Sequence, residues 1–174
     1  SYRVGVEAPT RPAPHWDATM LETLSPGSPK MWTLHIGDSF SDVPDSHIFY
    51  AFVETIFHKG VTGGCGGTGY CPGNAALRKQ MAVFVLKAKN GVCYTPPACQ
   101  GVFPDVPCSS PFATWIEQFA AEGISSGCGG GLYCPSNPAR RDQMAVFLLK
   151  AKYGSTFTPP KCAGDFLDVQ CPST

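Results

Sequence analysis

The sequence predicts a mainly α-helical fold, built from tandem helix–loop–helix repeats with disulfide-clasped loops and preceded by an extended, strand-like N-terminal segment. Three observations lead to this prediction. The segment FSDVP at Phe40 returns 63 residues later as FPDVP at Phe103. The run QMAVFVLKAK at Gln80 returns at the same offset as QMAVFLLKAK. Cysteines flank a glycine run twice, as GCGGTGYCP from Gly64 and then as GCGGGLYCP.

This offset divides the chain into four parts. Residues 1–39 lie outside the repeat and are either the end of a preceding domain or an arm that packs on another copy. Residues 40–102 form the first repeat and residues 103–165 the second, with about half of the aligned positions identical and no gap. Residues 166–174 match the opening of a repeat, so we expect the start of a truncated third repeat there.

Each repeat is predicted to contain a helix, a loop, a second helix and an extended tail. Apolar residues at helical spacing place the first helix at about 47–59 and again at about 111–122. Gly60 and Gly123 follow these helices, at the usual place of a left-handed C-cap residue.

The second helix of each repeat is predicted to begin near Arg78 and near Arg141. Lysines occupy its last turns, where cations suit the helix dipole, and Gly91 and Gly154 follow as stops. The tails YTPPAC and FTPPKC are predicted to be extended, because each proline disfavours helix in the residue before it.

Residues 1–39 follow a different pattern. SYRVGVE and MWTLHIG alternate apolar and polar residues, which is typical of strands. The stretch between them, which includes TRPAPHW and SPGSPK, is predicted to be loop-like.

The composition narrows the class of protein. Of 174 residues, 43% are hydrophobic and 15% are charged, which favours a packed globule over a disordered chain. The formal net charge is zero, so a nucleic-acid partner has no electrostatic support. No apolar run approaches the length of a membrane-spanning helix, and we expect no membrane span.

Nine cysteines are many for a cytosolic chain and indicate an oxidising compartment outside the membrane. A disulfide around a glycine loop offsets the entropy lost when that loop is ordered. The recurring positions predict four disulfides: Cys65–Cys71, Cys128–Cys134, Cys99–Cys108 and Cys162–Cys171.

Cys93 is left unpaired by this scheme and is either a free or half-buried thiol or the site of an intermolecular bridge. Zinc is the rival use of paired cysteines. The spacings here are longer than the C-x₂₋₄-C pairs of structural zinc sites, and no histidine stands beside them. We therefore expect no metal and no cofactor.

These segments resemble the S-layer homology (SLH) repeat, whose unit opens with F-x-D-V and continues through a glycine loop to a T-R-A-E helix start. The matching segments are FSDVPDSH, KGVTGGCGGTGYCPGN and LRKQMAVFVLKA, then FPDVPCSS, EGISSGCGGGLYCPSN and RRDQMAVFLLKA. Gln80 and Gln143 stand where the family has glutamate. Residues 40–174 are similar to the cysteine-containing branch found at the C-terminal ends of secreted bacterial proteins.

The resemblance implies a pseudo-threefold arrangement of three repeats, with a central helix bundle and grooves between units. It also implies a bacterial cell-surface location and non-covalent attachment to cell-envelope polysaccharide. By position, the residues that would help to form the glycan groove are Asp42, Arg78, Asp105 and Arg141.

Each of these residues also has a structural interpretation. The aspartates suit a turn, in which a carboxylate accepts hydrogen bonds from nearby backbone N–H groups. The arginines stand at helix starts, where the dipole disfavours a cation, so each requires a compensating partner. That partner is either the recurring aspartate or a carbonyl, or else an anionic glycan.

No catalytic motif is present, and the four histidines do not recur. Glu54 and Glu117 do recur, but each stands alone on its predicted helix. We therefore expect a non-catalytic surface module, not an enzyme, that anchors to envelope polysaccharide. The alternative is a self-assembling subunit of an extracellular filament or surface array, a homo-oligomer in which residues 1–39 dock on a neighbouring copy.

Overall fold

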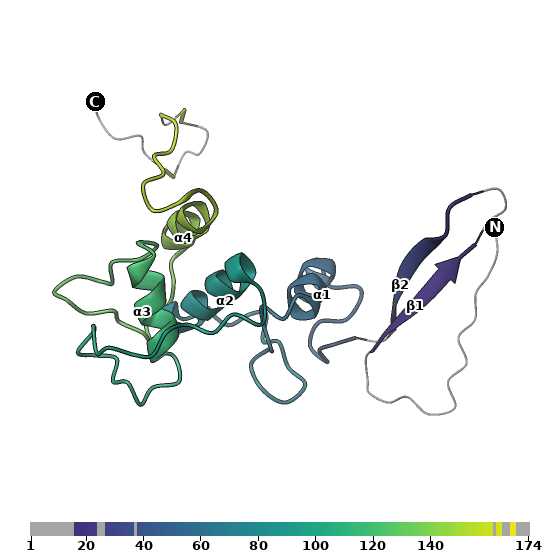
Figure 1. Ribbon diagram of the computed structural model, residues 1–174, viewed down its shortest axis with the longest axis horizontal. Helices are drawn as coiled ribbons and strands as arrows, with labels where there is room; N and C mark the ends of the chain where they lie inside the picture. The colour runs from purple at the N-terminus through teal and green to yellow at the C-terminus, as the bar shows by residue number, and fades with distance from the viewer. Residues whose placement is uncertain (1–15, 24–26, 37, 162, 165–167, 170–174) are drawn as a thin grey trace. The chain divides into compact units, whose positions relative to one another are not determined.

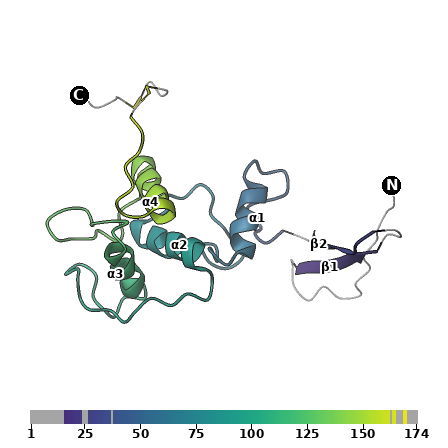
Figure 2. The same ribbon diagram turned by 45° about the horizontal axis from the view of Figure 1, so that its top comes forward.

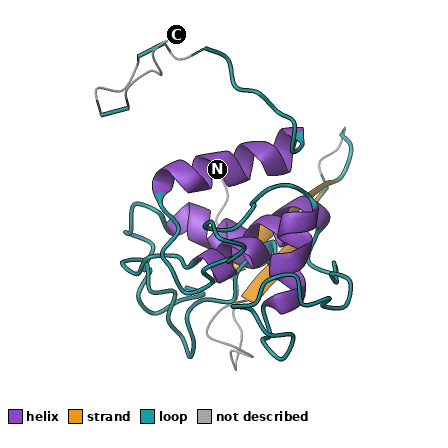
Figure 3. Ribbon diagram, turned by 90° about the vertical axis from the view of Figure 1, so that its left-hand side faces the viewer, coloured by secondary structure: helices purple, strands orange, loops and turns teal. Residues whose placement is uncertain are grey.

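The computed structural model describes residues 16–23, 27–36, 38–161, 163–164 and 168–169 (Figure 1). These residues form four helices and one two-stranded sheet, so the mainly helical prediction is confirmed. The helices are separated by long loops and tails, drawn in teal in Figure 3. None of the helices in the described part of the chain is long and apolar enough to cross a membrane.

The chain divides into two compact units, residues 1–74 and residues 75–174. The division falls inside the first sequence repeat, between its cysteine loop and its second helix. The packing units and the sequence repeats are therefore out of phase, because the second helix of the first repeat packs with the second repeat.

The N-terminal sheet pairs β1 (Trp16–Glu22) with β2 (Lys30–Ile36) in antiparallel register, with Trp16 opposite Ile36. The strand predicted from MWTLHIG is β2. β1 lies in the stretch predicted to be loop-like, and that prediction is wrong. Prolines flank the seven residues WDATMLE but do not interrupt them, so this run is free to pair along its length. The predicted strand SYRVGVE lies outside the described residues.

The first unit also contains α1 (Tyr50–His58). This helix begins three residues later than predicted, because tight turns precede it: His47 N–H donates to the Pro44 carbonyl and Tyr50 N–H to the His47 carbonyl, both at 2.8 Å. Phe40 is 3% exposed, and its ring centroid lies 5.0 Å from that of Phe57. The core of this unit is small: Phe40, Val43 and Val53 are buried, and three partly buried aromatic side chains, Tyr50, Phe57 and Tyr70, pack against them.

The second unit contains α2 (Arg78–Asn90), α3 (Ala113–Ala121) and α4 (Arg141–Tyr153), which confirms the predicted starts of the second helix in each repeat. α2 packs against both α3 and α4 (Figure 2). Its core is larger than that of the first unit, and the side chains in it that are fully buried include Leu86, Ala113, Ile116, Phe119 and Tyr133.

The helix ends follow the sequence signals. Gly60 and Gly123 have φ of 66° and 68°, the left-handed conformation predicted for them. At the start of α2, the Gln80 side-chain oxygen accepts a hydrogen bond from Leu77 N–H at 2.8 Å. This is half of a capping box, a position at which glutamine and glutamate both serve.

Three of the predicted disulfides are confirmed: Cys65–Cys71, Cys99–Cys108 and Cys128–Cys134. Both partners of the fourth, Cys162 and Cys171, lie outside the described residues. Cys93 is free and exposed. Three disulfides in a chain of this size indicate an oxidising location outside the cytoplasm.

Candidate functional site

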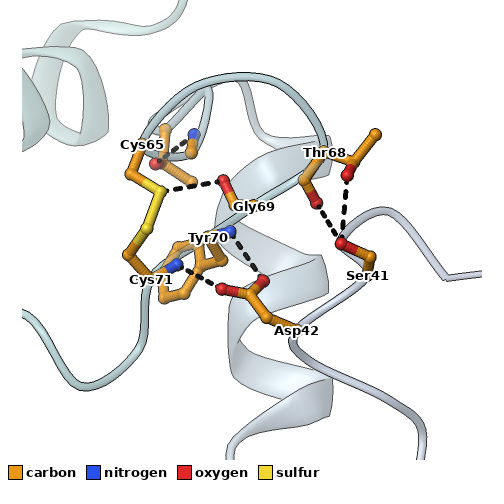
Figure 4. The surroundings of a disulfide bond; sticks show 9 residues. Ser41, Asp42, Cys65, Thr68, Gly69, Tyr70 and Cys71 are labelled. Carbon is orange, nitrogen blue, oxygen red and sulfur yellow. Dashed lines mark hydrogen bonds between the residues drawn. A yellow bond between two sulfur atoms is a disulfide. The ribbon is translucent and has the colours of Figure 1, made fainter.

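Asp42 of the first F-x-D-V segment points into the cysteine loop (Figure 4). Its two carboxylate oxygens accept hydrogen bonds from the backbone N–H groups of Tyr70 and Cys71, each at 2.7 Å. Beside it, Ser41 N–H donates to the Thr68 carbonyl at 2.9 Å. The motif thus holds the far side of the loop through backbone groups.

Asp105 repeats this arrangement in the second unit. It accepts hydrogen bonds from Tyr133 N–H at 2.9 Å and from Cys134 N–H at 2.7 Å. Both carboxylates have a lowered pKa. For Asp42 the cause is the pair of N–H donors. For Asp105, burial pushes the pKa upwards, but the two N–H donors and the Arg78 charge together outweigh it.

These hydrogen bonds fall where the backbone is strained. Cys71 and Cys134 have φ of 60° and 58°, a left-handed conformation that costs a non-glycine residue about 1–2 kcal/mol. Each is held by its disulfide on one side and by an aspartate oxygen on its N–H on the other. The aspartate and the disulfide therefore act together to fix the loop.

Glycine is required at the entrance of each cysteine loop, opposite the left-handed cysteine. Gly64 has φ of 81°, and a Cβ added there would lie 2.6 Å from Cε1 of Phe40. At the equivalent Gly127, with φ of 95°, a Cβ would clash with the Leu132 carbonyl. The glycine run lets the loop approach the phenylalanine of the F-x-D-V motif.

The recurring glutamates have a role that sequence reasoning missed. Glu117 accepts hydrogen bonds from Gln100 N–H at 2.6 Å and Val102 N–H at 2.8 Å. Glu54 accepts from Ser39 N–H at 3.0 Å, and Ser39 is the repeat counterpart of Val102. Each glutamate therefore fixes the backbone just before an F-x-D-V segment. Recurrence at the 63-residue offset was the signal that could have revealed this.

Arg78 is buried in the second unit, with 2% of its surface exposed. Its Nε donates to the Tyr133 carbonyl at 2.9 Å, and its Nη2 donates to Ser125 Oγ at 3.2 Å. The guanidinium carbon lies 4.9 Å from the centroid of the Tyr133 ring, a cation–π distance.

Tyr133 completes this arrangement, because its hydroxyl donates to the Arg78 carbonyl at 3.1 Å. Burial raises the pKa of Tyr133 to about 12, against the opposing effect of the Arg78 charge. Asp105 and Arg78 thus bind opposite ends of one residue, its N–H and its carbonyl. This tyrosine therefore holds α2 of the first repeat against the second repeat.

The four predicted groove residues consequently occupy three different settings. Asp42 and Asp105 hold cysteine loops, and Arg78 is buried against Tyr133. Arg141, the repeat counterpart of Arg78, is exposed at the start of α4. The structure brings Asp105 and Arg78 together and leaves Arg141 apart from them.

A groove of about 460 Å³ lies between α2 and α4. It is lined by three pairs of repeat counterparts: Val85 and Leu148, Ala88 and Ala151, and Lys89 and Lys152. The floor is apolar and the two lysines carry the charge. Lys89 also contacts Glu122 at 2.7 Å. Chemically, this groove suits an elongated ligand that combines an apolar face with anionic groups.

One cluster in the described part of the chain has metal-ligand geometry: Cys99, Cys108 and Glu117. Both of its sulfur atoms belong to a disulfide, so they offer no thiolate to a metal ion. The carboxylate of Glu117 already accepts the backbone hydrogen bonds described above.

Compared with models of known protein families, the chain matches none, and no curated protein is significantly similar to it in sequence. The S-layer homology resemblance therefore rests on the motifs and remains a proposal.

The two helix-start arginines give a matched test of the Tyr133 contact. Arg78→Met leaves the Tyr133 carbonyl without its charged donor, so we expect the free energy of unfolding to fall by about 2–4 kcal/mol. Arg141→Met, at the exposed counterpart, is expected to change it by less than about 0.5 kcal/mol. Urea denaturation of dilute, oxidised protein measures both values, and equal effects would contradict the assignment.

The aspartate hydrogen bonds predict a dependence of stability on pH. The ordinary pKa is 3.8 and both folded-state values lie below it. The contribution is therefore present above about pH 4 and is lost as the pH falls through the lowered pKa. Asp42→Asn/Asp105→Asn should be less stable at about pH 7 and lose less stability than wild type on acidification to about pH 3. Parallel stability curves for the two proteins would count against this role.

Proposed function

We propose that this chain is a non-catalytic structural module of a bacterial cell surface, related to S-layer homology repeats. One observation carries the proposal. Asp105, Glu117 and Arg78 stand at recurring positions, and each makes hydrogen bonds to backbone groups of the chain itself. Residues used in this way build a scaffold and leave little capacity for chemistry.

The same contacts support a non-enzymatic role. A general acid or base must exchange a proton with a substrate, and its pKa is usually moved towards neutrality. Asp42 and Asp105 have the opposite shift, and each accepts two backbone hydrogen bonds. A surface location agrees with the oxidising environment that the disulfides indicate.

The native protein tests this proposal. Immunogold labelling of the producing cells should place the chain at their surface. Non-reducing mass spectrometry of the chain isolated from that fraction should recover Cys65 linked to Cys71 and Cys128 linked to Cys134. A chain recovered from the cytoplasmic fraction with reduced thiols would overturn the proposal.

Attachment to envelope polysaccharide is a second candidate function, favoured by the groove between α2 and α4. Its apolar floor suits sugar faces, and Lys89 and Lys152 suit carboxylate or phosphate substituents. Three of the four residues implied by the resemblance already bond protein groups. We therefore propose that the two groove lysines make the glycan contacts.

Co-sedimentation with polysaccharide purified from the producing cells tests this attachment. The wild-type chain should pellet with the polysaccharide, and Lys89→Ala/Lys152→Ala should weaken binding about tenfold through the loss of two charge-assisted contacts. Lys161→Ala removes an exposed lysine outside the groove and serves as the control. A wild-type chain that stays in the supernatant, or equal weakening by the control, would refute the attachment.

A further inference from the structure

Two helices of nearly the same sequence lie in different environments. α2 reads RKQMAVFVLKAKN and α4 reads RDQMAVFLLKAKY. α2 buries five side chains, namely Arg78, Met81, Ala82, Val85 and Leu86, whereas α4 buries only Phe147. Leu148, the counterpart of Val85, is 55% exposed. Since the sequences are so similar, the difference reflects what packs on each helix. α4 therefore leaves exposed a surface whose counterpart on α2 is buried.

The surface that covers part of α2 is built by the first helix and the cysteine loop of the second repeat. Besides Tyr133, it offers two aromatic side chains on α3 and the residue before it. The Lys79 ammonium lies 5.3 Å from the ring centroid of Phe112. Tyr94, in the tail after α2, meets Trp115 edge to face at 6.1 Å. We call Phe112, Trp115 and Tyr133 the receiving surface of the second repeat.

The first repeat has a receiving surface of the same kind, and its two phenylalanines are exposed in the described part of the chain. Its members are Phe49, Phe52 and Tyr70, the counterparts of Phe112, Trp115 and Tyr133. Phe49 is 55% exposed and Phe52 is 71% exposed. Two neighbouring aromatic side chains with this exposure are unusual on an isolated soluble domain.

We propose that these two surfaces bind each other between copies: α4 of one chain docks on the receiving surface of the first repeat of a second chain. This inference rests on the proposed structural function and names its partner. Taken by itself, each described unit leaves one half of this contact largely exposed: the α4 surface in the second unit and the receiving surface in the first. A second copy supplies both, and the contact between copies repeats the contact between α2 and the second repeat.

The contacts at the centre of the α2 interface, those made by Arg78, have counterparts in the proposed contact between copies. Arg141 takes the place of Arg78 and finds the Tyr70 carbonyl and ring in place of those of Tyr133. The Thr62 hydroxyl takes the place of the Ser125 hydroxyl. The two are already equivalent within the chain, because Thr62 accepts a hydrogen bond from Gly64 N–H at 3.2 Å and Ser125 accepts one from Gly127 N–H at 3.3 Å.

The aromatic edge-to-face contact also has counterparts. Phe157 replaces Tyr94, and Phe52 replaces Trp115. Within the chain, the Phe157 ring stacks on that of Tyr153, with the centroids 4.8 Å apart. Docking therefore requires Phe157 either to leave the Tyr153 ring or to move together with it. Because the two docking surfaces are different patches, the contact is heterologous, and it generates either a closed ring or an open filament.

At the edge, one ion pair becomes a like-charge pair. Lys89 contacts Glu122 at 2.7 Å within the chain, and the counterparts of this pair are Lys152 and Lys59. Two lysines placed together repel, which keeps the association weak and sensitive to salt. This mismatch makes the geometry testable by charge reversal.

Sedimentation equilibrium of the full chain over a range of concentrations tests the proposal. Cys93→Ser is included throughout, so that no covalent dimer forms through the exposed thiol. The average mass should rise with concentration. Arg141→Met should weaken the association by about tenfold or more, because it removes a charged hydrogen-bond donor from the contact.

Charge reversal at Lys59 and Lys152 is the more specific test of this contact. Lys59→Glu or Lys152→Glu alone should strengthen the association by about fivefold, because each restores an opposite-charge pair. The double variant Lys59→Glu/Lys152→Glu restores repulsion and should return to about the wild-type value.

Three results would overturn the proposal: monomers at every concentration, association that ignores Arg141→Met, or single and double charge variants that behave alike. The proposed surface function fails separately, if the native chain is cytoplasmic and reduced.

Discussion

A carboxylate that accepts two consecutive backbone N–H groups decides the shape of each cysteine loop. Asp42 and Asp105 bind the loop where the chain passes through a left-handed cysteine, which is costly for a side chain with a Cβ. The disulfide ties the same cysteine to the loop entrance, and glycine at the entrance leaves room for the phenylalanine of the motif. The recurrence of aspartate, glycine and cysteine at one offset therefore reflects a single geometric requirement.

The position of the Tyr133 carbonyl depends on that loop, and the burial of Arg78 depends on the carbonyl. A guanidinium taken out of water requires fixed acceptors, and here it has a carbonyl, a hydroxyl and an aromatic face. The helix that carries Arg78 is thereby committed to the second repeat. This explains why the compact units divide the first repeat near residue 74 and do not follow the repeat boundary.

Local features were predictable from the sequence because they depend on neighbouring residues. The starts of α2 and α4, the left-handed glycines and the short disulfide rings all belong to this group. Features that depend on distant partners were not. β1 forms because β2 pairs with it, and Glu117 finds its donors in a tail 15 to 17 residues away. Arg78 and Arg141 have the same local sequence pattern, and only tertiary packing distinguishes the buried from the exposed one.

Amide hydrogen exchange, measured residue by residue by NMR, examines the loop geometry most directly. The N–H groups of Cys71 and Cys134 should exchange slowly, because carboxylate oxygens hold them, whereas those of Gly67 and Gly130 in the same loops should exchange rapidly. Equal, rapid exchange at all four positions would contradict the claim that the aspartates hold the loops, and the arrangement of Tyr133 and Arg78 built on it would lose its basis.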